Sequence, residues 1–289
     1  MNLTRVLQPY VCCLGNPVAG NPTQFVMYRA ARACGVDWRF FTSQVEVDQF
    51  EVAFRGVQAL GLSGMALFEP FQAKAMDLLD SVTESAMCLG GVNVARLDGK
   101  SWLGDNTLGV AIANCIEPFL ESILEPATSE SATVEPAPAI LIVGERKIAD
   151  AIRLANPEMA KRIVLVPVVE PTRIDPLAPR ESWELSSLEE FSEKGLHMDC
   201  LICQDIPSSA LSRQIATLTW SASASCLVLA GSTEKQLRSW RDILRTQNVK
   251  QIESVELMSH QSAADFYFWT GVVPSIELIR DSLEEYMQW

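Results

Sequence analysis

The sequence predicts an α/β protein in which two units each alternate strands with helices. Short apolar runs that stop at glycine or proline alternate with segments whose apolar residues recur at helical spacing. The segment of residues 125–138, EPATSESATVEPAP, has no large apolar face and is typical of an exposed linker between units. Apolar residues make up 48% of the 289 residues and charged residues 20%, so the chain can bury a core.

The first unit is expected to open with a strand, a helix and a second strand. Val11 to Leu14 is an apolar run that stops at Gly15-Asn16-Pro17, which indicates a strand running into a loop. From Thr23 to Gly35 the apolar positions recur at helical spacing, and the final glycine stands where a C-cap belongs. Asp37 to Ser43 is then typical of a strand.

The rest of this unit continues the alternation. The pattern predicts a helix at 47–60, a strand at 64–68, a helix at 71–79, strands at 91–96 and 101–103 that turn at Asp98-Gly99, and a long helix at 107–124. This order favours a mainly parallel sheet.

A second α/β unit is predicted over about residues 139–250. Its first strand, Ala139 to Val143, meets Gly144, and Lys147 to Leu154 continues at helical spacing. Further strands are predicted at 163–169, 200–203 and 226–229. After this unit, Gln261 to Tyr286 is apolar and helical in pattern.

Charge and hydropathy argue against two kinds of partner. The 23 Lys and Arg against 36 Asp and Glu give a net charge of −13 without a basic patch, so we expect no nucleic-acid binding. The apolar runs are shorter than the roughly 20 residues of a membrane helix, and Gln8 and Pro9 interrupt any signal-peptide core. We expect a cytoplasmic protein with no membrane partner, and the oligomeric state stays open.

The eight cysteines lie mostly inside apolar stretches. Cys200-Leu-Ile-Cys203 has the spacing of a redox or metal motif, but residues 198–203 are typical of a buried strand. A zinc site needs a second pair of ligands, and the only histidines are His197 and His260. We therefore favour structural roles for these cysteines and for the vicinal Cys12-Cys13, and expect no metal site.

A strand that runs into a glycine and then a helix is where open α/β sheets bind nucleotide phosphates. Here the turn is Gly144-Glu145-Arg146-Lys147, with one glycine where the strong fingerprint has several. Glu145 would repel a diphosphate, whereas Arg146 and Lys147 would attract one. Two interpretations stay open, a structural strand-to-helix turn and an anion site built from side chains.

Four spaced segments then follow one order along nearly the whole chain: Gly15-Asn16-Pro17-Val18-Ala19, Gly90-Gly91-Val92-Asn93, Gly104-Asp105-Asn106-Thr107, and Gln261-Ser262-Ala263 to Trp269-Thr270-Gly271. In order and spacing they resemble the G-N-P-[IV]-x, G-A-V-N-T, G-x-N-T-D and Q-A…W-T-G motifs of the shikimate dehydrogenase family.

The resemblance implies a two-domain enzyme. Residues 1–110 together with 255–289 would form an α/β substrate-binding domain that includes the returning C-terminal helices, and residues 111–254 a Rossmann-like domain. The implied activity is NADP-dependent interconversion of 3-dehydroshikimate and shikimate, or of a related hydroxy acid, with the small-molecule ligand in the interdomain cleft. Gly144, Arg146 and Lys147 would contact the NADP cofactor.

The two proton-handling positions of the family are substituted in this chain. The family places a lysine at the end of N-V-T-x-P-x-K and an aspartate at the end of N-T-D, and here Gln72 and Leu108 align with them. Glutamine does not exchange a proton near neutral pH, and a leucine side chain makes no hydrogen bond. Lys74 and Asp105 are the nearest possible substitutes. Their ordinary alternatives are a solvated charge for Lys74 and a helix cap for Asp105.

The substrate pocket that the resemblance implies keeps two polar side chains intact, Asn93 and Gln261. Asn21 and Thr23 stand at the family's two serine positions. Phe68 replaces the threonine of N-V-T, which makes the expected pocket tighter and drier. For Asn93 and Gln261 we favour substrate binding over the roles of a satisfied loop amide and a helix-surface amide.

Two functions follow from these observations. The chain is either a divergent NADP-dependent oxidoreductase of the shikimate dehydrogenase type, or a non-catalytic homologue that binds a small molecule or a protein partner in the cleft. The joint loss of the proton-handling pair and of the glycine-rich turn favours the second function, whereas the collinear motifs favour the first.

Overall fold

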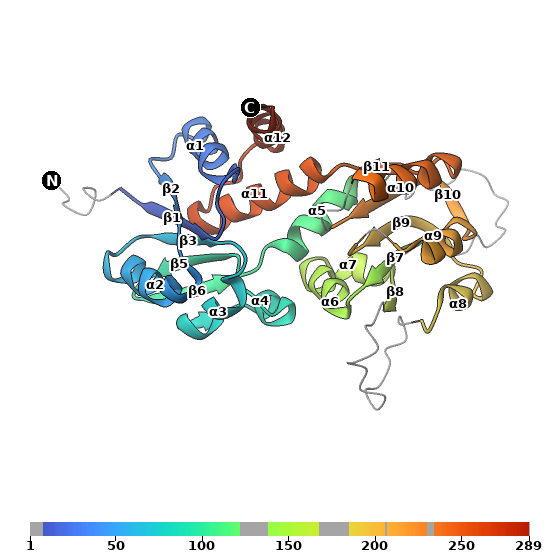
Figure 1. Cartoon of the computed structure of the whole chain (residues 1–289), viewed down its shortest axis with the longest axis horizontal. Helices are drawn as coiled ribbons and strands as arrows, with labels where there is room; N and C mark the ends of the chain where they lie inside the picture. Colours follow the sequence, from blue (N-terminus) through green and yellow to red (C-terminus); the bar gives the residue numbers. More distant parts are fainter. Residues whose placement is uncertain (1–7, 122–137, 168–184, 206, 230–233, 289) are drawn as a thin grey trace. The chain divides into compact units, whose positions relative to one another are not determined.

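The computed structural model describes residues 8–121, 138–167, 185–205, 207–229 and 234–288, which fold as two compact units (Figure 1). Unit 1 comprises Met1–Ala111 and Val255–Trp289, and unit 2 comprises Ile112–Ser254. Strands and helices alternate in both units, and the C-terminal helices belong to unit 1. The predicted α/β fold with returning C-terminal helices is confirmed.

The described strands of unit 1 form a six-stranded sheet in the order β2-β1-β3-β5-β6-β4. These strands are β1 (Tyr10–Gly15), β2 (Arg39–Gln44), β3 (Gly64–Leu67), β4 (Ser81–Val82), β5 (Val94–Asp98) and β6 (Ser101–Asp105). Strand β1 is parallel to β2 and β3, but β5 is antiparallel to both of its neighbours. Because β4 is in turn parallel to β6, five of these six strands run in one direction and the expectation of a mainly parallel sheet is confirmed. The exception is β5, which forms a hairpin with β6 whose turn contains Gly99 at φ +65°.

Helices cover both faces of the unit 1 sheet, as the alternation along β1 requires. Val11 and Cys13 belong to one buried cluster, and Cys12 and Leu14 belong to another, because successive strand residues point to opposite faces. The helices that contribute residues to unit 1 are α1 (Thr23–Ala33), α2 (Phe50–Ala59), α3 (Gln72–Ala75), α4 (Glu84–Leu89), α5 (Leu108–Glu121), α11 (Ser254–Thr270) and α12 (Ile276–Met287), with the short 3-10 helices η2 (Val47–Gln49) and η3 (Met76–Leu78).

The C-terminal helical segment is interrupted. The pattern predicts one helical stretch from Gln261 to Tyr286, whereas the structure has α11 and α12 with residues 271–275 between them. Gly271 adopts φ +69° directly after α11, and Pro274 has no amide hydrogen to continue a helical ladder. Phe266 and Trp269 of α11 and Ile279 of α12 are buried in the same cluster as Val11.

Unit 2 contains a five-stranded parallel sheet in the order β11-β10-β9-β7-β8. Its described strands are β7 (Pro138–Gly144), β8 (Ile163–Pro167), β9 (His197–Cys203), β10 (Trp220–Val228) and β11 (Lys250–Ile252). Its further described helices are α6 (Arg146–Ala155), α7 (Pro157–Ala160), α8 (Leu188–Glu193), α9 (Ser209–Ala216) and α10 (Glu234–Thr246). The strand order reverses at β7, which lies between β8 and β9. Most of the expected linker, and the end of the expected strand 163–169, lie outside the described residues.

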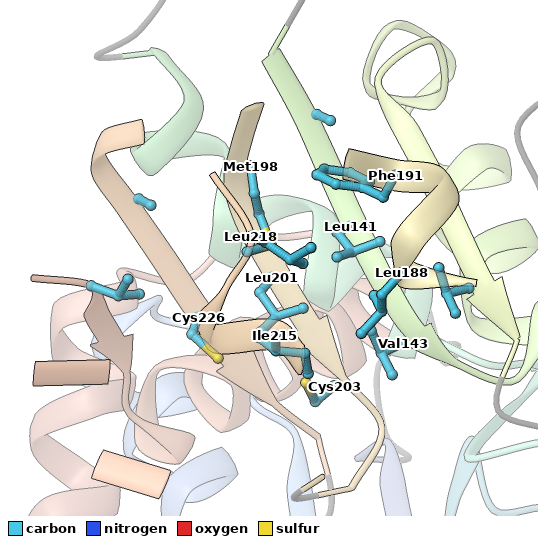
Figure 2. Close-up of a cluster of buried hydrophobic side chains, with 14 of the residues drawn as sticks. Leu141, Val143, Leu188, Phe191, Met198, Leu201, Cys203, Ile215, Leu218 and Cys226 are labelled. Carbon is cyan, nitrogen blue, oxygen red and sulfur yellow. The ribbon is translucent and has the colours of Figure 1, made fainter. Parts of the chain in front are cut away.

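The core of unit 2 is built from alternate residues of its central strands and the helices above them. Figure 2 shows Leu141 and Val143 of β7 beside Leu188 and Phe191 of α8. Cys203 and Cys226 lie in the same buried cluster. Cys200 is also buried and free, and burial raises the pKa of its thiol to about 12, so it is an inert core residue.

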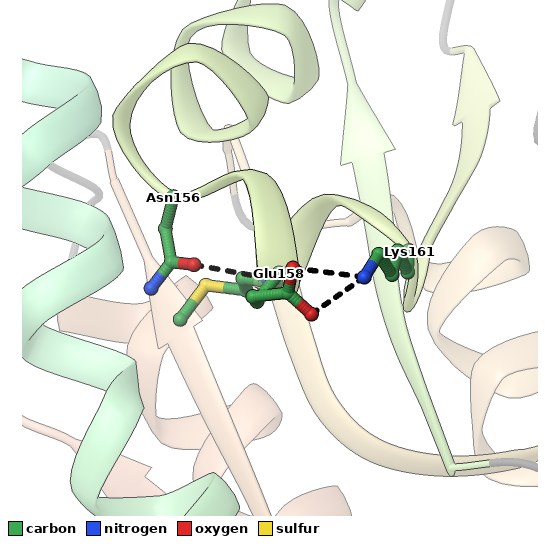
Figure 3. Close-up of polar contacts among 4 residues, drawn as sticks. Asn156, Glu158 and Lys161 are labelled. Atoms are coloured by element: carbon green, nitrogen blue, oxygen red, sulfur yellow. Dashed lines mark hydrogen bonds and ion pairs between the residues drawn. The ribbon is translucent and has the colours of Figure 1, made fainter.

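Two ion pairs in consecutive positions of unit 2 differ in burial. Lys161 and Glu158 form an ion pair of 2.6 Å on the exposed surface (Figure 3). Beside it, Asn156 Oδ1 accepts a hydrogen bond of 3.0 Å from the Met159 amide at the N-cap of α7. The next residue, Arg162, pairs with Asp199 of β9 at 3.0 Å, and the Asp199 side chain is only 1% exposed. None of the helices in the described ranges is both long enough and apolar enough to cross a membrane.

Candidate functional site

Three segments that carry polar residues end at one edge of the unit 1 sheet. Strand β3 ends there at Leu67, the antiparallel β5 begins there after Asn93, and β6 ends there at Asp105. The Leu67 amide donates to the Asn93 carbonyl at 2.8 Å, and the Asn93 amide donates to the Asp105 carbonyl at 3.0 Å. This pairing fixes the Asn93 side chain next to the start of α5.

The side chains of Asn93, Thr107 and Asp265 form a connected polar group, here called the Asp265 cluster. Asn93 Nδ2 donates to Thr107 Oγ1 at 2.8 Å and to Asp265 Oδ1 at 3.2 Å, and Thr107 Oγ1 donates to Asp265 Oδ1 at 2.5 Å. Asn93 Oδ1 accepts the Thr107 amide at 3.0 Å. The cluster therefore joins residues 93, 107 and 265, which come from three separate parts of the sequence.

The environment of the Asp265 cluster holds the Asp265 carboxyl close to its titration point at neutral pH. Asn93 and Thr107 are buried. Burial raises the pKa of Asp265 from 3.8 to about 7, the hydrogen bonds from Thr107 and Asn93 oppose this rise, and the charge of Asp105 adds to it. A carboxyl with such a pKa can both accept and donate a proton under physiological conditions.

Gln72 and Leu108 lie at the same edge but exchange no proton. Gln72 is the first residue of α3, where its Nε2 donates to the Leu67 carbonyl at 3.0 Å and its own carbonyl accepts the Val92 amide at 3.0 Å. Leu108 begins α5, and its amide donates to Asn106 Oδ1 at 3.2 Å. These two side chains supply an amide and an alkyl group to this edge.

The two nearest possible substitutes have different surroundings. Lys74 is exposed on α3. Asp105 is the last residue of β6, where its Oδ1 accepts the Asn106 amide at 2.7 Å and the Thr83 hydroxyl. The alternative of Asp105 as a cap of α5 is wrong, because Asn106 supplies the side-chain oxygen at that helix end.

The other expected substrate contacts are distributed over three elements. Asn21 Oδ1 accepts the amide of Thr23 at 2.9 Å, so these residues form the turn that starts α1. Phe68 follows β3 and packs closely on Gly15, where an added Cβ would lie 3.1 Å from the Phe68 Cβ. Gln261 is half-buried on α11, one helical turn before Asp265.

The Gly144 turn of unit 2 has a different chemistry. It lies at the carboxyl end of β7, where the strand order reverses, and this is the position at which open α/β sheets receive dinucleotides. An added Cβ at Gly144 would lie 2.9 Å from the Cβ of Gln204. Gln204 accepts the Glu145 amide at 2.8 Å and donates to the Glu145 carboxylate at 2.6 Å. The space beside Gly144 is therefore filled by the Gln204 side chain and is not an open phosphate-binding loop.

The charges at this turn are paired with each other. Lys147 contacts the Glu145 carboxylate at 2.7 Å, and Arg146 lies 3.5 Å from Asp150. The hydrogen bonds from Lys147 and Gln204 lower the pKa of Glu145, so its carboxylate stays ionised. Two cations at a helix N-terminus fit an anionic ligand, and Glu145 is the group that competes with such a ligand for them.

A separate hollow of about 370 Å³ lies at the opposite edge of the unit 1 sheet, between the end of α1 and the start of β2. Arg32, Trp38 and Arg39 are among its lining residues. It contains none of the expected site residues, so we place the candidate site at the Asp265 cluster, where the polar groups converge.

Comparisons with known proteins show which enzymes the chain is similar to. Residues 13–95 match the model of the shikimate dehydrogenase substrate binding domain. The shikimate dehydrogenase (NADP(+)) of Bacillus subtilis (strain 168) is 25% identical to this chain, and the alignment covers 92% of this chain and 93% of that enzyme. The shikimate dehydrogenase (NADP(+)) of Pyrococcus abyssi (strain GE5 / Orsay) is 26% identical, and the alignment covers 92% of this chain and 94% of that enzyme. The chain is thus similar to shikimate dehydrogenases over most of its length, and residues 13–95 match their substrate binding domain.

Solved structures related to this family share the fold. Shikimate 5-dehydrogenase from Thermus thermophilus, in complex with NADP(H) and shikimate, has a TM-score of 0.66 and 15% identity over 96% of this chain and all of its own. The ligand-free 5-ketofructose reductase of Gluconobacter sp. strain CHM43 has a TM-score of 0.61 and 16% identity over 97% and 99%.

One residue of the candidate site was missed by the sequence analysis. Asp265 was not selected, because it lies in the apolar segment that was interpreted only as a helix. The available signal was a lone carboxylate among Ala263, Ala264 and Phe266, four residues after Gln261 and therefore on the same helix face.

Proposed function

We propose that the protein is an NADP-dependent oxidoreductase of the shikimate dehydrogenase type, which interconverts 3-dehydroshikimate and shikimate or a related hydroxy acid. Unit 1 binds the hydroxy acid and unit 2 binds NADP. The observation that carries the proposal is the similarity over 92% of the chain to an enzyme of that name, with both domains included. The buried amide and hydroxyl groups of the Asp265 cluster support it independently.

In unit 1, polar side chains at the sheet edge would orient the substrate. The Gln261 amide, half-buried and on the same helix face as Asp265, can meet a ligand hydroxyl or carboxylate. Asn93 would position the ligand through a side chain that is itself fixed by Thr107. Asn21 and Thr23 add polar groups at the start of α1, and Phe68 limits the width beside Gly15.

In unit 2, Arg146 and Lys147 are the residues that would contact the phosphates of NADP. The chemistry that NADP supplies when bound is the acceptance or return of a hydride. On ligand binding the two cations would exchange their contacts with Glu145 and Asp150 for contacts with phosphate oxygens. Because Gly144 has no side chain, Gln204 can approach the turn and fix it by accepting a hydrogen bond from the Glu145 amide.

A charge-neutralising substitution at the turn tests this placement. In Glu145→Gln the carboxylate that competes with an anionic ligand for Lys147 is removed, so we expect NADP⁺ to bind about 3- to 10-fold more tightly, which is roughly 0.7 to 1.4 kcal/mol. The measurement is isothermal titration calorimetry with NADP⁺. Glu158→Gln, which removes an exposed carboxylate paired with Lys161 in the same unit, is the control and should leave the affinity unchanged.

A non-catalytic role is the second candidate, and the substitutions Gln72 and Leu108 favour it. The two functions are separated by an assay of the purified chain, in which NADPH is followed with 3-dehydroshikimate and, in reverse, NADP⁺ with shikimate. Turnover that scales with enzyme concentration supports the oxidoreductase. If neither direction shows turnover while a small molecule other than shikimate raises the melting temperature, the protein is a binding homologue.

A further inference from the structure

In the described part of unit 1, the half-buried carboxyl group of Asp265 is hydrogen-bonded to the side-chain amide of Asn93 and has a pKa near neutral pH. Asp265 reaches the sheet edge from α11, and its Oδ1 is the acceptor for both Asn93 and Thr107. Hydrogen bonds to the described residues all engage Oδ1 and leave Oδ2 available. One carboxylate oxygen is thus used to hold the group in place, and the other can meet a ligand.

The neighbours of Asp265 supply no permanent positive charge. Within the described residues, the ionisable groups that act on it are Asp105 at the end of β6 and the buried thiol of Cys13 in β1, and the pKa of that thiol is raised to about 12. The Cys13 thiol therefore stays neutral at physiological pH. The hydrogen bonds from the neutral Asn93 and Thr107 side chains lower the pKa of Asp265, whereas the charge of Asp105 raises it.

We propose that Asp265 is the group that exchanges a proton with the reacting hydroxyl of the substrate. This inference rests on the proposed function. In the oxidising direction the substrate O–H bond breaks and its proton passes to Asp265, the hydride leaves the same carbon for NADP⁺, and the remaining electron pair completes the C=O bond. In the reducing direction the protonated Asp265 returns the proton to the carbonyl oxygen while NADPH supplies the hydride.

This role explains why an ionisable group, Asp265, lies at a site where Gln72 and Leu108 have replaced the two proton-exchanging residues of the family. Asp105, the other carboxylate at this edge, has its Oδ1 engaged by the Asn106 amide and the Thr83 hydroxyl. Asp265 has an available oxygen and is held by two side chains that are themselves buried. The acid-base function would thus be supplied by α11 instead of by α3 and α5.

A purely structural role for Asp265 makes a different prediction. If the carboxyl only fixed Asn93, an asparagine in its place would serve, because the Oδ1 of the substituted side chain could still accept from Thr107. The test therefore uses Asp265→Asn, which keeps size and acceptor geometry but removes proton exchange, and Asp281→Asn on the exposed surface of α12 as the control.

For the proton-exchange role we expect Asp265→Asn to lower kcat by about 10²- to 10⁴-fold with little change in the Kd for NADP⁺. The limb of the wild-type pH profile near neutral pH should be lost, and Asp281→Asn should match the wild type. A variant that keeps kcat within about 3-fold and retains that limb would overturn the inference while leaving the proposed function intact.

A second readout does not depend on turnover. Shikimate that donates a hydroxyl to the carboxylate should release a proton on binding near pH 7, which calorimetry in buffers of different ionisation enthalpy detects. Proton release that is lost in Asp265→Asn places Asp265 at the ligand hydroxyl. If the wild type binds shikimate with no turnover, the proposed function fails; unchanged proton release in the variant then rejects the Asp265 inference as well.

Discussion

The hydroxyl of Thr107 is the shared member of the Asp265 cluster. It accepts from Asn93 Nδ2 and donates to Asp265 Oδ1, so it transmits the position of one side chain to the other. A hydroxyl that does both is difficult to replace, because a single change removes one hydrogen bond from Asn93 and one from Asp265, which then keep only their bond to each other within the cluster.

Thr107→Val removes this hydroxyl while keeping the shape of the side chain. Because the Thr107 hydrogen bond lowers the pKa of Asp265, we expect the pKa in the variant to rise above about 7. The measurement is a pH titration of the side-chain carboxyl groups by isotope-edited NMR. Thr246→Val, at an exposed position of α10, is the control and should leave the Asp265 titration unchanged. A fall in the pKa would contradict the assigned network.

The consecutive residues Lys161 and Arg162 offer a matched comparison of exposed and buried ion pairs. Arg162→Met leaves the Asp199 carboxylate buried without its cation, so we expect unfolding of unit 2 to need about 3 to 5 kcal/mol less. Lys161→Met removes an exposed pair and should change stability by less than about 0.5 kcal/mol. Denaturant unfolding followed by circular dichroism measures both. Equal effects of the two substitutions would show that the Asp199 pair is not desolvated.

At the level of single residues, the sequence allowed some site residues to be selected and others not. Asn93 was selected because the segment that it closes resembles the G-A-V-N-T motif of the shikimate dehydrogenase family, and the structure places it in the Asp265 cluster. Asp265 was missed because helical periodicity alone does not tell whether a polar residue in an apolar helix faces solvent or a neighbouring sheet edge. That distinction depends on how α11 packs on the sheet, which is a tertiary property.

Helix α11 contacts the unit 1 sheet at a position that only glycine allows. An added Cβ at Gly64 of β3 would lie 2.7 Å from Trp269 Cδ1 and 3.0 Å from the Ala95 carbonyl oxygen. The indole Nε1 of Trp269 donates to that same carbonyl at 3.1 Å. The lack of a side chain at residue 64 thus allows the ring of Trp269 to approach β3 and β5.

Gly64→Ala should displace Trp269 and loosen the attachment of α11, with a loss of about 1 to 3 kcal/mol of stability and a red shift of tryptophan fluorescence. Gly56→Ala is the control, since no atom lies within 4 Å of an added Cβ in α2, and helix propensity predicts a gain of about 0.5 to 1 kcal/mol. If Gly64→Ala were as harmless as Gly56→Ala, the close contact with Trp269 would not limit packing.

Elements with a strong period or clear end signals were predictable. The strands β1, β3 and β7 were expected from short apolar runs, and α1 ends two residues before Gly35, which has φ +67°. The short helices α4 and α7 and the two-residue strand β4 were missed, because such brief segments contain less than two periods of any pattern. The antiparallel hairpin of β5 and β6 was expected from the turn at Asp98-Gly99. The order of the strands across the sheet was not expected, because it depends on pairing between segments that are distant in the sequence.

For the whole molecule, the raised pKa of Asp265 makes stability depend on pH. The folded chain holds this proton more tightly than the unfolded chain, for which the ordinary value of 3.8 applies. Folding therefore takes up a proton between pH 3.8 and about 7, and the contribution of this group to stability falls as the pH rises through that window, by up to about 1.4 kcal/mol per pH unit.

Asp265→Asn removes this titration. We expect the variant to have a higher melting temperature than the wild type at pH 8, and the difference should shrink as the pH falls and be smallest below 3.8, where the wild-type carboxyl is largely neutral in both states. Thermal unfolding across this range measures the effect, with Asp281→Asn as the control. A difference that stays constant with pH would mean that the Asp265 pKa is not raised.

The order of synthesis has a consequence for unit 1, because unit 2 separates its two parts in the sequence. When the first 111 residues have left the ribosome, the sheet still lacks the helix that brings Phe266, Trp269 and Asp265. The nascent chain must finish all of unit 2 before those side chains emerge. Ligand recognition at this edge is thus delayed until the segment after unit 2 has been synthesised, and a polypeptide cut short at residue 254 would expose an apolar face in place of a binding site.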